Sequence, residues 1–598
     1  MFEFIIQYNS ENKKAFNSFQ LNGDNERHET FHYKDETISV HTLSHKELNY
    51  KQKFENSDKL ILVNGIILGR HRTGNSYYDA SDIAKQLKEN TFDYEKFKGE
   101  FTLFIYDKKK QSLNIYTAPI GLKPVYYGSI DSHVYISNDL TLLKQIDTDI
   151  DPVTLLEKAI FTYPISDNTY LKRFKFLSPG SQYIFNKNDF KKENTFDIES
   201  FVFNTINQKF TYSKFVDLFN QNIKQRTTVV DKPLVTLTGG FDGRAVVSSL
   251  LKYKIDFYSY SFGAEEGENT SIPERVSRAA GIKYQPVYLN NNYKNQYPFY
   301  AAQAITLSDG MSCFERANYN YVFDKLNYQS PVLLSGLIGG EVLGVLFSKT
   351  DYFNEEYYNC FLGNKQFNLN SILKNKQLSE FLNISDSEHE ELLNRIATRQ
   401  DILNKLSSQY GTKMLYMYDL ITMGFRRFYG TQMHQERYQF ENLLPFFDLD
   451  ILEYLFTTDF KQRYKYSFTK QKHYKFINRK PQASIIQQNS PLLANIPVDR
   501  GFKPKHLLNM WHYPYAYYKY YLRNKKRKVE EFFSEDWSQL FYYELLNKNI
   551  GFDDLFNDEM ICAFMEDYKP EHYNHEFNHL LSAALWASNT KKYINRTE

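Results

Sequence analysis

The stretch PLVTLTGGFDGRAVVSSLL, residues 233–251, constrains the fold of this chain more than any other segment. It reads as a buried strand that runs through TGGFDG directly into a helix. Glycines in such a turn let backbone N–H groups converge, and the following helix presents the positive end of its dipole. We therefore expect the turn to bind an anion, with pyrophosphate as the first candidate. A plain strand-to-helix turn is the alternative, and Thr238 and Asp242 weigh against it because they add a hydroxyl and a carboxylate suited to magnesium.

Hydrophobic patterns divide the 598 residues into two unlike parts, and this length already calls for more than one core. Between residues 59 and 127, short alternating runs separated by turns predict an antiparallel, β-rich region. From about residue 212, strands alternate with helices, which predicts a parallel sheet covered on both faces. The chain after Asn354 is expected to be mostly helical. We place the domains at 1–205 and 210–598, with the junction at 201–208.

Composition excludes several classes of protein. The chain has 73 Lys and Arg against 71 Asp and Glu, so it lacks the net basic charge of a general nucleic-acid binder. The three cysteines are too few and too scattered for a disulfide framework or a zinc site. We find neither an uninterrupted apolar run long enough for a membrane span nor a secretory signal at the start. These features predict a soluble cytoplasmic protein without nucleic-acid or membrane partners.

The turn also carries a family resemblance. LTGGFDGR resembles the SGGxDS pyrophosphate loop of the asparagine synthetase family, in which the aspartate binds magnesium. Thr238 stands in place of the first serine, Gly243 replaces the second, and Arg244 is either a phosphate ligand or part of a solvated helix face. A later segment, DFYSYSFG, resembles the family's adenine-contacting strand. The nucleotide-binding residues that the resemblance implies are Leu237, Thr238, Gly239, Gly240, Asp242, Gly243, Arg244, Phe262, Gly263, Ser335 and Gly336.

A second glycine-rich segment, VLLSGLIGGEVLG, resembles the family's VLLSGxGxDExxGG. Leu337 occupies a position that is usually acidic or phenolic, and Gly340 occupies that of the second magnesium-binding aspartate. Glu341 is the nearest carboxylate able to replace that ligand, so the implied metal ligands are Asp242 and Glu341. Further on, FENLLPFFDLD is similar to the family's PFLD segment, with Glu441 and Asp448 as supports of the site.

The front region resembles the glutaminase domain of the same family, an antiparallel sandwich of the Ntn type. LVNGIILG, with Asn64 and Gly65, is similar to that domain's NGEIYN segment. Family members that use glutamine need an N-terminal cysteine as nucleophile and base. This chain begins Met1-Phe2, and Ile66 replaces a glutamate of the pocket. Asp82 is either a glutamine-amine partner or a helix cap. We therefore expect a degenerate class II glutaminase-like domain, inactive as a glutaminase.

The resemblance implies amide formation through an acyl-adenylate. This reaction requires a cation near the phosphates of ATP. The resemblance places it before a glycine in LANIPVDRGFKPKHL, where Lys503 is the first choice and Arg500 and Lys505 are the others. Lys472 is an outside candidate. His473 and His434 are candidate bases, although a lone histidine is more often structural. The expected catalytic residues are Lys503, Arg500 and Glu341.

The resemblance thus implies an α/β enzyme that uses ATP and Mg²⁺ to join a small-molecule or peptide carboxylate to an amine, releasing AMP and pyrophosphate. Loss of the cysteine is shared with β-lactam synthetases and lasso-peptide cyclases, which use an amine other than glutamine's. A nucleotide-binding pseudoenzyme or assembly protein of the same fold is the rival hypothesis. A homodimer or a pathway protein is left open as a partner. The run YYKYYLRNKKRK, residues 517–528, predicts either a ligand-binding patch or an amphipathic helix with a solvated basic face.

Overall fold

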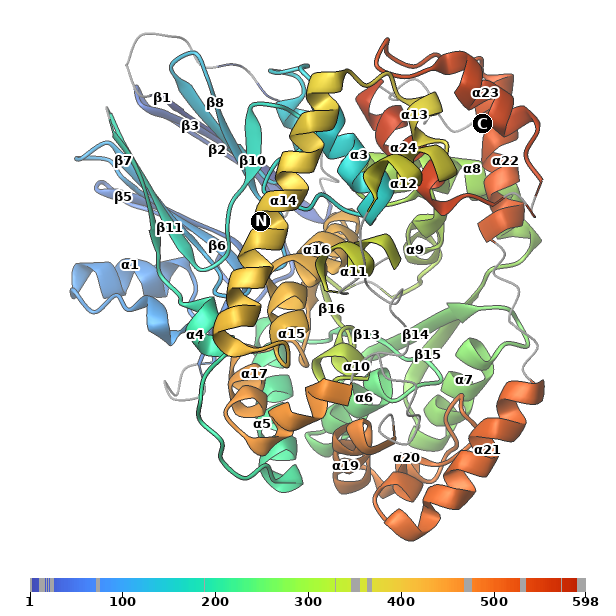
Figure 1. Cartoon of the computed structure of the whole chain (residues 1–598). Coiled ribbons are helices and arrows are strands. Elements are labelled where there is room, and N and C mark those ends of the chain that lie inside the picture. The colour runs from blue at the N-terminus through green and yellow to red at the C-terminus, as the bar shows by residue number, and fades with distance from the viewer. Residues whose placement is uncertain are drawn as a thin grey trace.

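The computed structural model describes residues 3–9, 17, 19, 21, 26–70, 76–187, 189–328, 330–345, 355–362, 368–466, 476–526, 534–569, 571 and 573–588. Two six-stranded antiparallel sheets occupy the front region, and a five-stranded parallel sheet with many helices occupies the rest (Figure 1). This arrangement confirms the predicted fold class. The domain limits at 205 and 210 stay a prediction.

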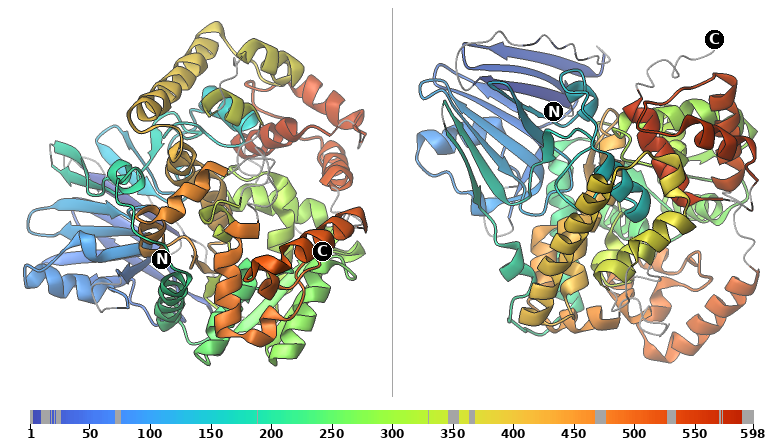
Figure 2. Two further views of the ribbon diagram at one scale, coloured as in Figure 1. Left: turned by 60° about the horizontal axis from the view of Figure 1, so that its bottom comes forward. Right: turned by 45° about the horizontal axis from the view of Figure 1, so that its top comes forward.

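The two front sheets pack face to face (Figure 2, right). The ring of Phe4 in β1 lies 5.0 Å from the ring of Phe104 in β6, so one strand of each sheet contributes to a shared apolar layer. One sheet runs in the order β10-β8-β9-β1-β3-β2, with bounds β1 (Glu3–Asn9), β2 (His28–Lys34), β3 (Ile38–His45), β8 (Tyr126–Ile130), β9 (His133–Ser137) and β10 (Phe174–Phe176). The other runs β12-β11-β7-β6-β5-β4, with bounds β4 (Lys53–Glu55), β5 (Lys59–Gly69), β6 (Phe97–Asp107), β7 (Ser112–Thr117), β11 (Ser181–Asn186) and β12 (Asp189–Asn194).

Short helices close the sandwich and lead out of it. They are α1 (Ala80–Lys88), η1 (Tyr94–Lys96), α2 (Leu140–Leu143), α3 (Pro152–Phe161) and α4 (Ile198–Val202). Helix α1 begins with a capping box in which the side chains of Asp79 and Asp82 each accept an N–H of the other residue. Asp82 therefore acts as a helix cap, the second of the two roles we considered for it.

The parallel sheet has the order β15-β14-β13-β16-β17, and every neighbouring pair is parallel. Its strands are β13 (Leu234–Thr236), β14 (Tyr258–Gly263), β15 (Lys283–Tyr288), β16 (Val332–Leu334) and β17 (Glu441–Leu443). Helices α5 (Tyr212–Arg226), α6 (Asp242–Lys252) and α19 (Lys480–Asn489) pack together, whereas α8 (Asn291–Leu307) packs against α9 (Ala317–Asp324) on the other side (Figure 1). Helices thus cover both faces, as parallel strands require.

The chain beyond residue 354 is mostly helical in its described ranges, as expected. The remaining elements are η2 (Thr227–Val229), α7 (Glu268–Ala280), η3 (Phe314–Arg316), α10 (Gly339–Val342), α11 (Glu355–Phe361), α12 (Leu369–Asn375), α13 (Leu378–Phe381), α14 (Asp386–Tyr410), α15 (Leu415–Asp419), the π-helical η4 (Leu420–Gly424), α16 (Phe425–Gln435), α17 (Leu449–Phe456), η5 (Asp459–Tyr466), α20 (Pro491–Ala494), η6 (Pro504–Leu507), η7 (Met510–His512), α21 (Tyr513–Lys526), α22 (Ser534–Asn547), α23 (Asp558–Glu566) and α24 (His575–Ala587). None of the helices in the described ranges has the length and apolarity that crossing a bilayer requires.

Buried ion pairs join the sandwich to the second half of the chain. Lys98 of β6 lies 3.0 Å from Asp448 and 2.7 Å from Asp450, and all three side chains are at most 3% exposed. Lys123 pairs with Glu441 of β17. Both family-matched carboxylates, Glu441 and Asp448, therefore hold the parallel-sheet region against the sandwich, in keeping with the supporting role we expected.

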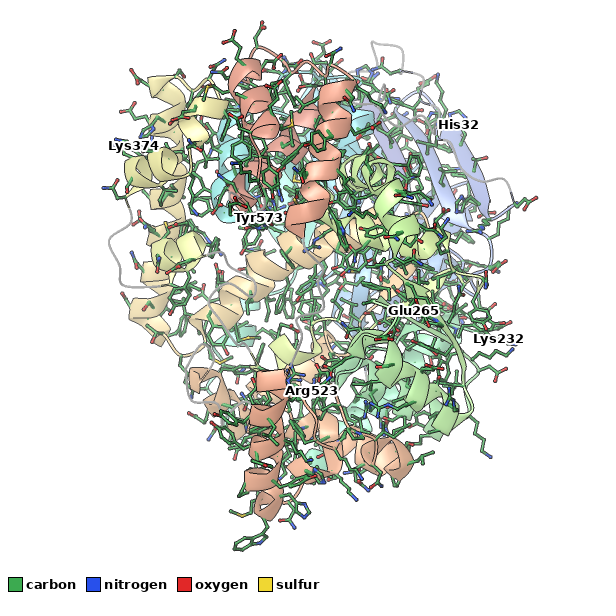
Figure 3. All side chains as sticks on the ribbon, turned by 90° about the vertical axis from the view of Figure 1, so that its right-hand side faces the viewer. His32, Lys232, Glu265, Lys374, Arg523 and Tyr573 are labelled. Carbon is green, nitrogen blue, oxygen red and sulfur yellow. The ribbon has the colours of Figure 1, made fainter. Side chains whose placement is uncertain are left out.

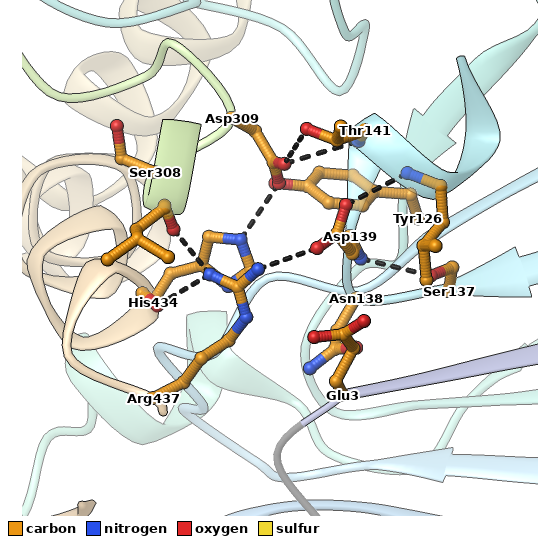
Figure 4. Close-up of polar contacts among 12 residues, drawn as sticks. Glu3, Tyr126, Ser137, Asn138, Asp139, Thr141, Ser308, Asp309, His434 and Arg437 are labelled. Atoms are coloured by element: carbon orange, nitrogen blue, oxygen red, sulfur yellow. Dashed lines mark hydrogen bonds and ion pairs between the residues drawn. The ribbon is translucent and has the colours of Figure 1, made fainter. Parts of the chain in front are cut away.

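His434 belongs to a second buried group at this junction (Figure 4). Its Nε2 lies 2.8 Å from Asp309 Oδ2, and neighbouring Arg437 lies 2.6 Å from Asp139 near the end of β9. Burial and the Arg437 guanidinium hold the pKa of His434 well below its usual value, so its imidazole is neutral at physiological pH. These contacts give His434 a structural role in place of the catalytic base that we had considered.

Candidate nucleotide-binding site

The turn singled out in the sequence connects β13 to α6, as predicted. Leu237 extends the strand, since its N–H donates to Tyr260 O at 2.8 Å. The N–H of Gly240 donates to Thr238 Oγ1 at 3.4 Å, and Gly239 O accepts the N–H of Asp499 at 3.0 Å. The turn is thereby fixed to a distant loop that precedes Gly501.

Glycine is required at Gly243 by close packing. A Cβ atom at this position would lie 2.4 Å from Thr236 O and 3.3 Å from Leu237 Cα. Both neighbours are backbone atoms of the incoming strand, so neither can move aside cheaply. The serine that the family carries here does not fit this backbone, which explains the exchange seen in the sequence.

Asp242 is the first residue of α6 and is half-buried. Burial raises its pKa to about 6, while the nearby guanidinium groups of Arg479 and Arg500 oppose that shift. The side-chain amide of Gln482 donates to Asp242 Oδ1. Arg500 also contacts Asp499, at 2.8 and 2.9 Å. A carboxylate pair and an arginine pair therefore meet at the start of the helix.

The second glycine-rich segment packs directly against Asp242. Ser335 Oγ lies 3.3 Å from Thr236 Oγ1 and accepts the N–H of Leu337 at 3.2 Å. A Cβ at Gly336 would lie 2.6 Å from the carbonyl carbon of Asp242, so this residue must also be glycine. The two resembling segments, about a hundred residues apart, thus form one site.

Ile338 carries backbone strain in this segment. It is a buried β-branched residue with φ 65°, in the left-handed region that such side chains avoid. Strain of this kind costs about 1–3 kcal/mol and clusters at functional sites. Glu341 follows in α10 and lies close enough to Arg479 to raise that residue's pKa, although burial brings the net pKa of Arg479 down to about 10.

Two of the predicted site residues make contacts other than those we expected. Arg244 is completely buried, and its guanidinium donates to the carbonyls of Leu493, Ile496 and Pro497, so it points away from the turn. This geometry corrects the expectation that Arg244 binds phosphate. Lys503 precedes η6, where its backbone N–H donates to His506, and we find no contact between Lys503 and the turn among the described residues.

Phe262 ends β14 and packs edge-on against Tyr319 at 5.7 Å, next to Gly263. This position at the carboxyl end of the sheet suits an adenine contact and a core aromatic equally, and the proposed role of both residues stays a prediction. Lys472 and His473 lie outside the described residues. Lys505 lies in η6.

Sequence reasoning missed Arg479 and Gln482. Both belong to α19 or its cap, more than two hundred residues after the turn. Pro481 at the start of the helix marks a helix N-terminus in the sequence, which was the one local signal available. Nothing in NRKPQASIIQQ shows that its first turn faces Asp242, because that proximity comes from packing of α19 on α6.

The corresponding site in the sandwich shows a different pattern. Asn64 of β5 is 1% exposed, and neither atom of its side-chain amide has a hydrogen-bond partner within the described part of the chain. Gly65 follows with φ 95°, and a Cβ there would lie 2.0 Å from Glu100 O. Ile66 is buried in the apolar core. The asparagine-glycine pair is thus kept within the strand, with an apolar side chain beside it.

Comparison with known proteins gives one domain match in the front region and two related enzymes. Residues 79–196 match the family model of the glutamine amidotransferase domain. A putative glutamine-hydrolyzing asparagine synthetase 1 of Methanocaldococcus jannaschii is 22% identical over 221 residues, which cover 36% of this chain and 39% of that protein. The glutamine-hydrolyzing asparagine synthetase 1 of Bacillus subtilis is 24% identical over 211 residues, which cover 34% of this chain and 33% of that protein. The matches therefore span less than half of the relatives' length.

Among solved structures, the glutamine phosphoribosylpyrophosphate amidotransferase from B. subtilis, complexed with ADP and GMP, matches with a TM-score of 0.18 and 12% identity, covering 42% of this chain and 51% of that one. A second structure, of the allosteric regulatory enzyme of purine biosynthesis, matches with a TM-score of 0.19 and 11% identity. The match covers 48% of this chain and 59% of that one. The family assignment depends on the domain match, the two sequence relatives and the paired glycine-rich segments. These findings support a relationship between the chain and the asparagine synthetase family.

Proposed function

We propose that the protein is an ATP-dependent amide ligase that activates a carboxylate as an acyl-adenylate and then joins it to an amine that does not come from glutamine. The observation that carries this proposal is the position of Asp242. It lies half-buried at the N-terminus of α6, after a glycine turn and within electrostatic reach of two arginines. An anion of high charge suits this combination of helix dipole, backbone N–H groups and guanidinium groups.

The residues beside Asp242 also fit a magnesium ion. Mg²⁺ prefers hard oxygen ligands and is held in such enzymes by one or two protein groups plus phosphate oxygens. Asp242 supplies a carboxylate, and the buried Gln482 Oε1 has no hydrogen-bond partner among the described residues. Described residues contain no group of three or more His, Cys, Asp or Glu able to form an all-protein metal cage. When bound with ATP, the ion would neutralise charge on the phosphates.

In the proposed mechanism, backbone N–H groups of the turn and the start of α6 hold the pyrophosphate portion of ATP. The substrate carboxylate attacks the α-phosphorus, and the bond to pyrophosphate breaks. Arg479 and Arg500 stabilise the charge that develops on the departing pyrophosphate. The amine then attacks the acyl carbonyl, and AMP leaves. Arg500 and Arg479 take the place that we had first assigned to Lys503.

The proposal of a non-glutamine amine depends on the front domain. No cysteine precedes Cys313, and Ile66 places a buried apolar side chain next to Asn64 and Gly65 in β5. Glutamine hydrolysis in this family requires a thiolate nucleophile, so a sandwich without one is expected to serve as a structural support. The buried pairs between Lys98, Asp448 and Asp450 agree with that supporting role.

A nucleotide-binding pseudoenzyme is the second candidate. Gly340 and Leu337 favour it, because neither can supply the ligand or the proton acceptor found at those positions in the family. The two hypotheses differ in their products, since a pseudoenzyme binds ATP without turnover.

The deciding experiment incubates the full chain with ATP, Mg²⁺ and a panel of amino acids and other carboxylates, with and without amines. Production of AMP and pyrophosphate supports the proposal, and ADP with phosphate would refute it. Asp242→Asn should abolish turnover, whereas Asp256→Asn, an exposed aspartate of the same domain, should not. Binding of ATP without any turnover across the panel would favour the pseudoenzyme.

A further inference from the structure

The short helix η7 and the helix α21 present an unusual number of large apolar side chains to solvent. The exposed fractions are 70% for Met510, 83% for Trp511, 48% for Tyr515, 46% for Tyr517 and 56% for Tyr518. Four of these five residues are aromatic, and we call the five together the aromatic face. Tyr515 and Tyr518 are three residues apart in α21, which places them on one side of that helix, and Trp511 lies in η7 just before it. Clustered exposure of this kind marks an interaction surface.

The opposite side of α21 is already occupied by the protein itself. Ala516 is completely buried, and the ring of Tyr520 lies 6.0 Å from that of Phe476. Arg523 forms an ion pair with Glu268 at the start of α7. A helix that is apolar on its inner and outer sides is normally covered on both. The outer stripe therefore calls for a partner.

Charge identifies the kind of partner. From Gly501 to Lys526 the sequence contains six Lys and Arg and no Asp or Glu. Lys519 lies beside the aromatic face, with its Nζ 5.5 Å from the centre of the Tyr515 ring. The segment thus combines tyrosine and tryptophan with cations, and it attracts an anionic surface.

The shape of this surface distinguishes between a peptide, a nucleic acid and a membrane as its partner. Helix α21 lies at the edge of the molecule, where Figures 1 and 3 show it projecting below the parallel sheet. A peptide or a folded nucleic acid is usually held in a groove, whereas this surface is the outer side of a single helix. Tryptophan and tyrosine settle at the boundary between lipid headgroups and acyl chains, and lysine beside them binds anionic headgroups. We propose that the aromatic face docks the protein onto an anionic phospholipid membrane.

This inference is independent of the proposed ligase activity, because no residue of the aromatic face belongs to the nucleotide site. The proposal replaces our expectation that the protein has no membrane partner. Residues 517–526 are helical, but the side chains after Arg523 lie outside the described ones, so the solvated basic face stays a prediction. In the described part of that segment, tyrosines are the more exposed residues, and Lys519 and Arg523 are only partly exposed.

The test measures sedimentation of the full chain with phosphatidylcholine vesicles, with and without phosphatidylglycerol. We expect binding to the anionic vesicles only, weakened by added salt because counterions screen the attraction. Trp511→Ser combined with Tyr515→Ser and Tyr518→Ser should reduce binding at least tenfold, and Lys519→Glu by roughly tenfold. Tyr543→Ser, on α22, removes a tyrosine of similar exposure (54%) and should leave binding unchanged.

Tryptophan fluorescence provides a second readout. Of the three tryptophans, Trp586 is buried and Trp537 packs 5.0 Å from Tyr293, so a blue shift on adding vesicles reports Trp511. The shift should disappear in Trp511→Phe, and retained thermal denaturation would show that each variant folds. Equal sedimentation of the triple variant and the wild type would overturn the proposal. It would also fail if poly-glutamate or RNA shifted the Trp511 emission while anionic vesicles did not.

Discussion

Replacing Gly243 by alanine adds one methyl group at a place where the structure has no room for it. The new Cβ would lie 2.4 Å from Thr236 O, about 1 Å closer than an ordinary contact. Relief requires the start of α6 to move away from β13. Overpacking of this type costs typically 1–3 kcal/mol, and the better helix propensity of alanine returns at most about 1 kcal/mol. We therefore expect a net destabilisation of about 2 kcal/mol.

Gly240 offers a matched control in the same turn. A Cβ there would meet only Thr238 Oγ1, at the ordinary distance of 3.6 Å. Thermal denaturation followed by intrinsic fluorescence compares Gly243→Ala, Gly243→Ser and Gly240→Ala with the wild type. The two Gly243 variants should melt several degrees lower, and Gly240→Ala within about one or two degrees of the wild type. Equal melting temperatures for Gly243→Ser and the wild type would refute our explanation for the loss of the family's serine.

Two further predictions concern buried charges. The pKa of Asp242 is raised to about 6, so ionisation of its carboxyl group opposes folding above about pH 6 and has no effect on stability below about pH 4. A pKa shift of this size lowers the free energy of unfolding by at most about 3 kcal/mol. Asp242→Asn should therefore be more stable than the wild type at pH 7.5, with the difference vanishing towards pH 4 in thermal denaturation, and a less stable variant at pH 7.5 would contradict this. Lys98→Met leaves the carboxylates of Asp448 and Asp450 buried with less compensation and should cost about 3–5 kcal/mol, seen as a lowered melting temperature. Lys109→Met breaks an exposed pair and should leave the melting temperature nearly unchanged, so equal effects of the two substitutions would argue against a buried junction.

Local patterns predicted much of this fold. The β-rich front, the strand-helix alternation and the turn before α6 follow from hydrophobic periodicity and from glycine, which act over a few residues. The shared site of the two glycine-rich segments was implied by the family resemblance, and it agrees with the rule that carboxyl ends of adjacent parallel strands meet at one edge of a sheet. Family resemblance added the identity of Asp242 as the central carboxylate.

The parts that could not be predicted depend on contacts across long stretches of chain. Arg244 follows the turn directly, yet it anchors the carbonyls of Leu493 and Ile496. Arg479 lies in an unremarkable basic segment, yet it reaches Asp242. In both cases the partner lies more than two hundred residues away, and single-sequence patterns carry no information about such pairs. Strain at Ile338 is likewise set by its surroundings.

The most direct test of the account is the affinity of the full chain for ATP with magnesium, measured by titration calorimetry. Our account predicts binding by the wild type and by Asp256→Asn, with losses of at least tenfold in Asp242→Asn and in Arg479→Met. Omission of magnesium should weaken binding by the wild type more than binding by Asp242→Asn. Equal affinities of wild type and Asp242→Asn would contradict the proposed site.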